Sequence, residues 1–217
     1  MGLIKDRKYK QEAAYHTKLG FVLSMGNRKM GRVMSFSTSP GLTCANGVPC
    51  YPRYCYAVKM ERIYPTVRNS WKNNYDLLKR YWGDDFVNDI SEAIRKKKPE
   101  LFRWHVGGDI FAKWYLDDMC FIAKKNKDVK FWAFTKQFDI LEDYEGEIPE
   151  NLTIVLSVWP PCVPSDKLKE KYGCCYFQDA EESYEVPDDA FICDGDCEMC
   201  RQCVELKAGS SVVIYKH

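Results

Sequence analysis

Seven cysteines, gathered in two tight groups, are the residues of this chain whose type and spacing best suit chemistry. The C-terminal group contains Cys193, Cys197, Cys200 and Cys203, and the upstream group contains Cys44, Cys50 and Cys55. Thiols spaced this closely are suited to share a metal, and iron-sulfur clusters and zinc are the usual occupants of such groups. The sequence therefore predicts two metal sites, with iron-sulfur favoured over zinc at the C-terminal one.

Composition limits the class of protein. The 217 residues are 46% hydrophobic and 14% aromatic, which is enough to bury one core, with room for a small appendage. The formal net charge of +1 provides no overall field to attract nucleic acid or an anionic membrane, although a local basic groove stays open as an alternative. The 11 cysteines are an odd number, so complete intrachain disulfide pairing is excluded.

The N-terminal residues indicate where the protein works. Residues 1–10 are charged throughout and lack the apolar run of a secretory signal. No apolar stretch approaches the length needed to span a bilayer. We therefore expect an intracellular, cytoplasmic protein with no membrane partner, and in that reducing compartment clustered cysteines favour metal or redox chemistry over disulfides.

Short apolar runs alternate with amphipathic segments and predict the elements that position the cysteines. Strands are predicted at residues 32–37, 101–106, 129–134, 153–157 and 173–177. Helices are predicted at residues 67–81, 84–97, 113–125, 138–141 and 166–171. Such alternation is typical of the α/β class, with a parallel sheet covered by helices. The acidic residues 179–189 predict an exposed linker.

Candidate site residues follow the predicted strands. Gly107, Gly108 and Asp109 come after the second strand, Lys136 after the third, and Ser157 closes the fourth. Loops at the carboxyl ends of parallel strands meet at one edge, so we expect these residues to converge with the cysteine loop at residues 44–55. Each has a plainer alternative: a tight glycine turn capped by the aspartate, and an exposed turn lysine.

The remaining candidates are weaker. His105 lies within a strand and is more often a packed side chain than a ligand or base. Cys120 lies on an amphipathic helix and is interpreted as a small core residue. Cys174 and Cys175 are adjacent on a strand, so their side chains point to opposite faces and at most one of them reaches any given site.

Several of these segments together resemble a family of phage proteins, the gene product eighty-eight family. They are the run from Ser35 to Gly41, Thr43-Cys44 with Cys50 and Cys55, Arg103 to Asp109, residues 131–136, and the final cysteine group. The family pattern is similar to a compact, divergent radical S-adenosylmethionine (SAM) enzyme. The resemblance implies a partial (β/α) barrel at residues 1–178, followed by a linker and a cysteine-rich auxiliary metal-binding extension at residues 179–217.

The resemblance also implies roles for individual residues. Cys44, Cys50 and Cys55 would hold three irons of a [4Fe-4S] cluster, leaving the fourth iron to bind SAM. Tyr54 matches an aromatic position that approaches adenine, and Gly107-Gly108-Asp109 matches a segment that accepts hydrogen bonds from the methionine ammonium. Ser157 would line the same edge, with Lys136 and Asp109 as catalytic candidates, and the C-terminal cysteines would bind a second cluster.

Two functions from different classes follow. The first is an iron-sulfur redox enzyme that cleaves SAM to start radical chemistry on an unknown substrate, with a reductase or ferredoxin-type electron donor, in a bacterial cell or phage-infected host. The second is a non-catalytic protein stapled by zinc or iron-sulfur, which binds nucleic acid. Basic residues among the aromatic ones at residues 68–80 give the second function modest support.

Overall fold

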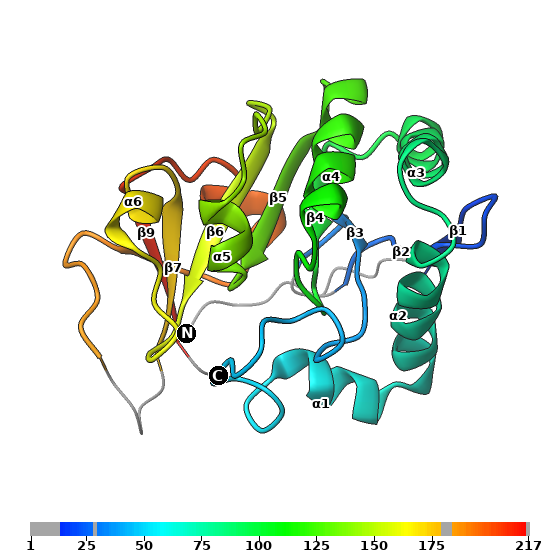
Figure 1. Cartoon of the computed structure of the whole chain (residues 1–217). Helices are drawn as coiled ribbons and strands as arrows, with labels where there is room; N and C mark the ends of the chain where they lie inside the picture. Colours follow the sequence, from blue (N-terminus) through cyan, green and yellow to red (C-terminus); the bar gives the residue numbers. More distant parts are fainter. Residues whose placement is uncertain (1–13, 28–29, 179–183, 216–217) are drawn as a thin grey trace.

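A nine-stranded, largely parallel sheet organises the chain (Figure 1). The computed structural model describes residues 14–27, 30–178 and 184–215. The strand order is β1-β2-β3-β4-β5-β6-β7-β9-β8. The pairs β1–β2 and β2–β3 are antiparallel, and every later pair is parallel. The predicted mixed α/β class is therefore confirmed.

The elements have the following bounds. The strands are β1 (Ala14–His16), β2 (Val22–Ser24), β3 (Met34–Phe36), β4 (Leu101–Trp104), β5 (Lys130–Thr135), β6 (Leu152–Val158), β7 (Gly173–Gln178), β8 (Phe191–Ile192) and β9 (Ser211–Tyr215). The helices are α1 (Tyr56–Ile63), α2 (Pro65–Leu78), α3 (Asp84–Lys97), α4 (Lys113–Lys125), α5 (Phe138–Glu142), α6 (Asp166–Lys169), α7 (Cys197–Cys200) and the 3-10 helix η1 (Gln202–Val204).

The predicted elements correspond to β3 to β7 and α2 to α6. Two differences have a clear physical cause. The strand predicted at residues 101–106 ends at Trp104, because His105 takes a left-handed backbone conformation with φ 59°. The helix predicted at residues 67–81 begins earlier, at Pro65, whose fixed φ suits the first helical position. Elements β1, β2, α1, α7, η1, β8 and β9 were not predicted.

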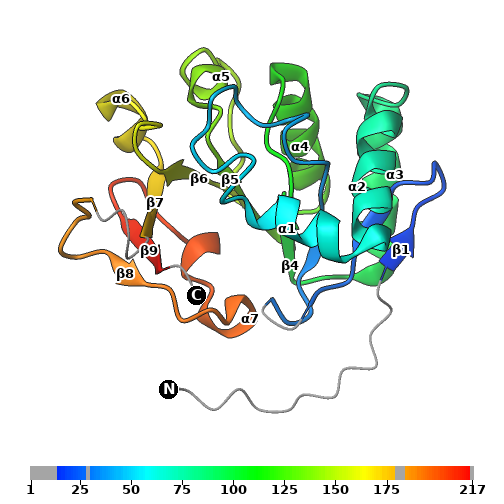
Figure 2. The same ribbon diagram turned by 90° about the horizontal axis from the view of Figure 1, so that it is seen from below.

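Helices α3, α4, α5 and α6 cover one face of the sheet, called here the first face (Figure 2). The largest buried side chains pack there. The rings of Phe21, Phe36 and Phe86 meet edge to face with centroids 5.1 to 5.9 Å apart, and Trp104 lies 5.7 Å from Phe36. Edge-to-face contacts of this kind add specificity to the apolar burial that holds helices on a sheet.

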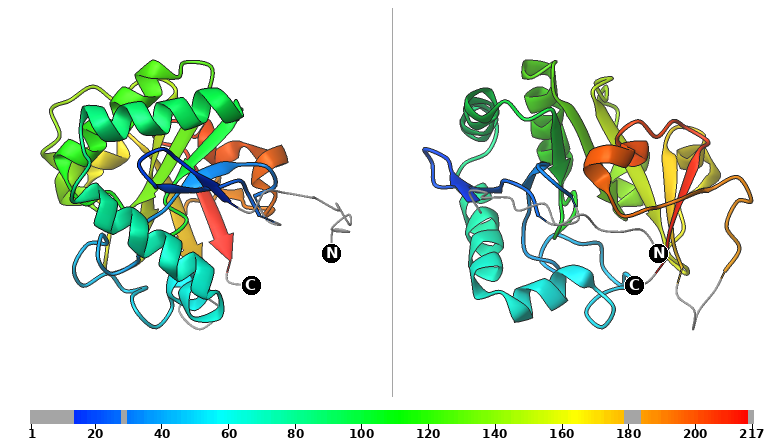
Figure 3. Two further views of the ribbon diagram at one scale, coloured as in Figure 1. Left: turned by 90° about the vertical axis from the view of Figure 1, so that its right-hand side faces the viewer. Right: turned by 180° about the vertical axis from the view of Figure 1, so that it is seen from behind.

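The C-terminal segment, with α7 and η1, lies on the opposite side, called here the second face (Figure 3). Val204 of η1 is buried with Trp132 of β5 in a separate apolar cluster, against which Cys197 and Cys203 pack. The Thr153 hydroxyl on β6 donates to the Val204 carbonyl at 2.7 Å. The C-terminal cysteines are therefore docked on the sheet.

The domain boundary expected between residues 178 and 179 stays a prediction. Strands β8 and β9 from the C-terminal part join the same sheet, with β9 paired to β7. Residues 1–13 and 179–183, which carry the charged N-terminus and part of the acidic linker, lie outside the described residues. Among the helices described, none is long and apolar enough to cross a membrane.

Asn74 joins α2 to the edge of the sheet. Its side chain is fully buried, accepts from Val22 N at 2.8 Å, and donates to the carbonyls of Val22 and Ser37 at 2.8 and 2.9 Å. The neighbouring Asn73 makes one bond, to the Gly20 carbonyl at 2.9 Å, and is only half-buried. The two residues thus form a matched pair with very different hydrogen bonding.

We expect Asn74→Ala to lower the free energy of unfolding by about 3 kcal/mol, because it strands three buried backbone groups. Asn73→Ala should cost less than about 1 kcal/mol. Urea unfolding followed by circular dichroism measures both. Equal losses for the two variants would contradict this role of Asn74.

Candidate metal and cofactor site

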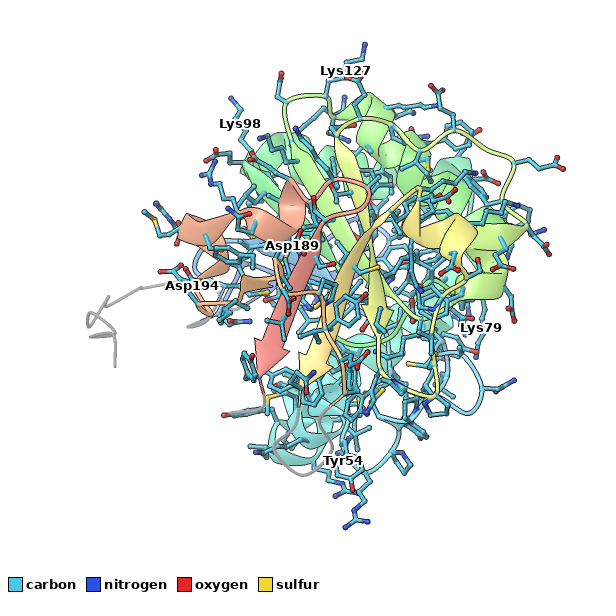
Figure 4. The ribbon with its side chains drawn as sticks, turned by 90° about the vertical axis from the view of Figure 1, so that its left-hand side faces the viewer. Tyr54, Lys79, Lys98, Lys127, Asp189 and Asp194 are labelled. Carbon is cyan, nitrogen blue, oxygen red and sulfur yellow. The ribbon has the colours of Figure 1, made fainter. Side chains whose placement is uncertain are left out.

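The loops that follow β3, β4, β5 and β6 meet at the carboxyl end of the sheet and are called here the rim. Figure 4 shows Tyr54 at the end to which β7 and β9 point, with Lys98 and Lys127 at the opposite end. The upstream cysteine loop and α1 lie at the rim (Figure 1). The convergence predicted from strand polarity is therefore what the fold produces.

The three upstream thiols are neighbours at the rim. The Cys50 thiol hydrogen bonds to Cys55, and this bond and burial raise the pKa of Cys50. The same bond lowers the pKa of Cys55, as do the backbone N–H groups of Val58 and Ala57 in the first turn of α1. Burial raises the pKa of Cys44 to about 11, with Cys55 among its charged neighbours. Cys55 is therefore the thiol that ionises first.

The donor set suits an iron-sulfur cluster in its chemistry. All 11 cysteines carry free thiols; in this loop Cys50 is hydrogen bonded to Cys55, and Cys44 has Cys55 as a charged neighbour. In the described part of the chain, no three Cys, His, Asp or Glu side chains are gathered closely enough to hold a metal ion. Sulfur ligands with a lysine beside them fit iron-sulfur chemistry better than magnesium or calcium, which prefer oxygen.

Asp109 is a buried anchor for two rim loops. Only 6% of it is exposed, and its carboxylate accepts from Ile110 N at 2.7 Å and from Lys136 N at 2.9 Å. Its own N–H donates to the Thr43 hydroxyl at 3.0 Å, beside Cys44. Desolvation raises the pKa of Asp109 to about 6, against the lowering effect of these donors.

The glycine pair lets the β4 loop approach the cysteine loop closely. A Cβ on Gly108 (φ +84°) would stand 2.0 Å from the Thr38 hydroxyl and 2.6 Å from that of Thr43. A Cβ on Gly107 would stand 2.5 Å from the Trp71 ring of α2. The glycines therefore do more than form a tight turn, because both also make room for neighbouring side chains.

Lys136 and Ser157 meet in the middle of the rim. The Lys136 ammonium donates to the Ser157 hydroxyl at 2.7 Å. Its charge also acts to lower the pKa of each upstream thiol, as one of the smaller contributions. The lysine is half-buried and engaged, so the alternative of an exposed turn lysine is wrong.

Tyr54 contacts the end of the sheet through aromatic rings. Its ring centroid lies 6.1 Å from that of Trp159, which stacks on Phe177 of β7 at 4.4 Å. The Arg53 guanidinium lies 5.2 Å from the Tyr54 centroid. With 37% of its surface exposed, Tyr54 offers a partly open ring at the rim.

Sequence reasoning missed the polar residues that connect these groups. Thr38 and Thr43 share a hydroxyl hydrogen bond of 3.0 Å, and the Gln137 amide donates to the Thr43 carbonyl at 3.0 Å. The position of Thr43, directly before Cys44, was the available signal. His105 is a packed side chain, as interpreted: it is buried against Tyr115, and burial lowers its pKa to about 3.

The C-terminal cysteines form their own group, apart from the rim. Burial raises the pKa of Cys203, whose charged neighbours include Cys193 and Cys197. Burial also raises the pKa of Cys200, which has Cys193 as a neighbour. The thiols of this group thus affect one another electrostatically, and metal binding by either cysteine group stays a prediction.

Gly108→Ala is expected to destabilise the protein by about 3 kcal/mol, since the methyl group meets two buried hydroxyls and the backbone is left-handed. Gly209→Ala is the matched control. Gly209 has φ +74° but open space around it, so backbone strain alone should cost about 1 kcal/mol. Chemical unfolding compares the two, and similar losses would remove the steric role of Gly108.

Asp109 also gives a pH prediction. The folded protein raises the pKa of Asp109 from 3.8 to about 6, so it favours the protonated side chain. The resulting contribution to the free energy of unfolding is complete below pH 3.8 and is lost as the pH rises through 6. From pH 7 to pH 4, wild type should therefore gain about 2 kcal/mol of stability relative to Asp109→Asn. Chemical unfolding at each pH measures this, and an equal change in the free energy of unfolding of the two proteins from pH 7 to pH 4 would contradict the raised pKa.

Comparison with known proteins places these features in a family. The family model described as "Gene product 88" matches residues 3–203. The Gene 88 proteins of Mycobacterium phages L5 and D29 are each 27% identical to the chain over 158 residues, which is 68% of this chain and 66% of theirs. The matched part thus spans just under two thirds of those relatives. No solved structure matches the chain.

Proposed function

The chain belongs to the gene product 88 family, and we propose that it is an iron-sulfur redox enzyme of the radical SAM kind. The observation that carries the proposal is the meeting of three free thiols with Lys136, Ser157 and the anchored Asp109 loop at the carboxyl end of a parallel sheet. Cofactor sites of parallel sheets lie at this end. In this proposal the sheet is the wall of a partial barrel.

Cys44, Cys50 and Cys55 would hold the cluster. When bound, a [4Fe-4S] cluster would supply one electron to SAM, whose cleavage gives methionine and a deoxyadenosyl radical that takes hydrogen from the substrate. The first turn of α1 favours the thiolate at Cys55, which is the form that ligates iron. The electron comes from a reductase or ferredoxin-type donor.

The remaining rim residues would bind and orient SAM. The ammonium of Lys136 is placed to attract a carboxylate, with Ser157 fixing its position at 2.7 Å. The partly open Tyr54 ring offers a surface for adenine. Asp109 is buried and accepts two backbone N–H groups, so its contribution is to set the shape of the Gly107-Gly108 turn.

The C-terminal cysteines would bind a second metal centre. An iron-sulfur cluster there would relay electrons, whereas zinc would serve as a structural staple. Because Cys197 and Cys203 pack on the second face of the sheet, either centre would also fasten the C-terminal segment to the sheet.

A metal-stapled protein that binds single-stranded nucleic acid is the second candidate. Four exposed tyrosines lie on the cysteine loop, on α1 and directly after it: Tyr51, Tyr54, Tyr56 and Tyr64. Exposed Arg53, Lys59 and Arg62 lie among them. Aromatic rings between basic side chains are what single strands bind. At residues 68–80, Trp71 packs near Gly107 and Tyr75 packs on Phe111. These two rings are engaged within the protein, so residues 68–80 are a weaker candidate for binding nucleic acid.

Anaerobic purification tests the first proposal. We expect iron and sulfide in the wild type, formation of 5′-deoxyadenosine from SAM on reduction, and loss of this product with at least a tenfold fall in rate in Cys55→Ser. Cys203→Ser should lose only the metal of the C-terminal centre. Cys120→Ser, on α4 in the first-face core, is the control and should keep both.

Two results would decide against the enzyme. Cluster-loaded protein that neither binds nor cleaves SAM would remove the radical SAM assignment. Zinc in both cysteine groups, together with RNA or DNA binding that weakens steeply as salt rises, would instead favour the nucleic-acid protein. Metal analysis and the visible spectrum separate these outcomes, because iron-sulfur protein is coloured and zinc protein is not.

A further inference from the structure

We propose that Cys175 of β7 is a ligand of the C-terminal metal centre, together with Cys193, Cys197 and Cys203. The inference rests on the proposed metal binding by the C-terminal cysteines. In this set Cys175, which lies on the sheet itself, takes the place of Cys200. The centre would join β7 to the segment that covers the second face.

Strand register places Cys175 on the second face. Trp132, which packs with Val204, pairs with Thr153 on β6, and Ser157 lies on the same side of β6 because it is four residues further along. Ser157 pairs with Cys175 across β6 and β7. Paired residues share a face, so the Cys175 side chain points toward the C-terminal segment.

The same register brings Cys193 to this face. Cys175 pairs with Val212 of β9, and Val212 pairs with Phe191 of β8. Cys193 follows Phe191 by two residues, and its N–H donates to the Val213 carbonyl at 2.9 Å. The strand alternation therefore directs Cys193 to the side on which Cys175 lies.

The thiols on this face affect one another electrostatically, although no three of them are gathered as closely as metal ligands are. Cys203 has Cys175, Cys193 and Cys197 among its charged neighbours, and Cys175 has Cys193 among its own. Cys200 differs: its thiol hydrogen bonds to the Asp194 carboxylate, and the thiol that acts on it is Cys193. Cys175 is thus better placed than Cys200 to complete a set of four with Cys203.

Arg103 supplies an independent sign that something anionic belongs here. Its side chain on β4 lies in register with Trp132, on the second face, and its charge acts on both Cys175 and Cys203. Its Nε is buried without a hydrogen-bond partner among the described residues. A metal held by four thiolates carries net negative charge, which this guanidinium would offset.

The plain alternative is that Cys175 is a small apolar core residue. That description fits its neighbour Cys174, which belongs to the first-face core cluster. Both residues are 4% exposed, but Cys175 belongs to neither apolar cluster of the described residues. The two adjacent cysteines therefore make a matched pair: equal burial, the same strand and opposite faces.

The test uses the full chain carrying Cys55→Ser, so that the measured metal is that of the C-terminal centre. Iron, sulfide and zinc per chain, the thiolate-to-metal absorption and metal retention against a chelator are compared after adding Cys174→Ser, Cys175→Ser or Cys203→Ser. We expect Cys175→Ser and Cys203→Ser to lower retention about tenfold or more. Cys174→Ser should retain metal as the parent does.

Thermal unfolding of the metal-free proteins provides the folding control, because Cys174→Ser and Cys175→Ser each place a hydroxyl in a buried site of the same strand. Cys175→Ser that retains metal as Cys174→Ser does would overturn this inference while leaving the C-terminal centre in place. A Cys55→Ser parent that binds no metal would overturn the C-terminal centre itself, and the inference with it.

Discussion

The long helices α3 and α4 lie on one face of the sheet, and the need to cover the other face is the constraint on which the rest depends. A largely parallel sheet exposes apolar residues on both sides, here Trp104 toward the helices and Trp132 away from them. The C-terminal segment covers the second side through Val204. The cysteine-rich segment is thus packed on the sheet through Val204, with Cys197 and Cys203 against the same cluster.

At the rim, the dominant interaction is between a buried carboxylate and main-chain N–H groups. Asp109 fixes the start of the Lys136 loop and, through Thr43, the start of the cysteine loop. Lys136 in turn reaches Ser157 on the next strand. The loops after β3, β4 and β5 and the end of β6 are thereby held relative to one another, as a site that binds a cofactor in one orientation requires.

Strand polarity and hydrophobic period were enough to predict the central elements and the meeting of the strand ends. Helices α3 and α4 match their predicted bounds, because each has a clear apolar face. Strand β9 was missed although Ser211–Tyr215 is rich in β-branched residues, since the cysteines before it suggested an appendage. The face of Cys175 required register, which depends on pairing between distant strands and cannot be derived from local pattern.

The hydrogen bonds of the rim were also beyond local pattern. The sequence places Thr43 beside Cys44, but the hydrogen bond between Thr38 and Thr43 and their contact with the loop of Gly108 depend on the fold. The same holds for Asn74, whose partners lie on β2 and just after β3. Contacts of this kind depend on tertiary packing, so a single sequence does not reveal which residues these side chains contact.

The order of the last strands also has a consequence for how the chain assembles during synthesis. Strand β9 is made after β8 and yet lies between β7 and β8. The two residues of β8 therefore have no sheet partner until β9 has left the ribosome, and Cys193 gains its bond to Val213 only then. Of the C-terminal thiols, Cys193 is therefore fixed in place only after β9 has been made.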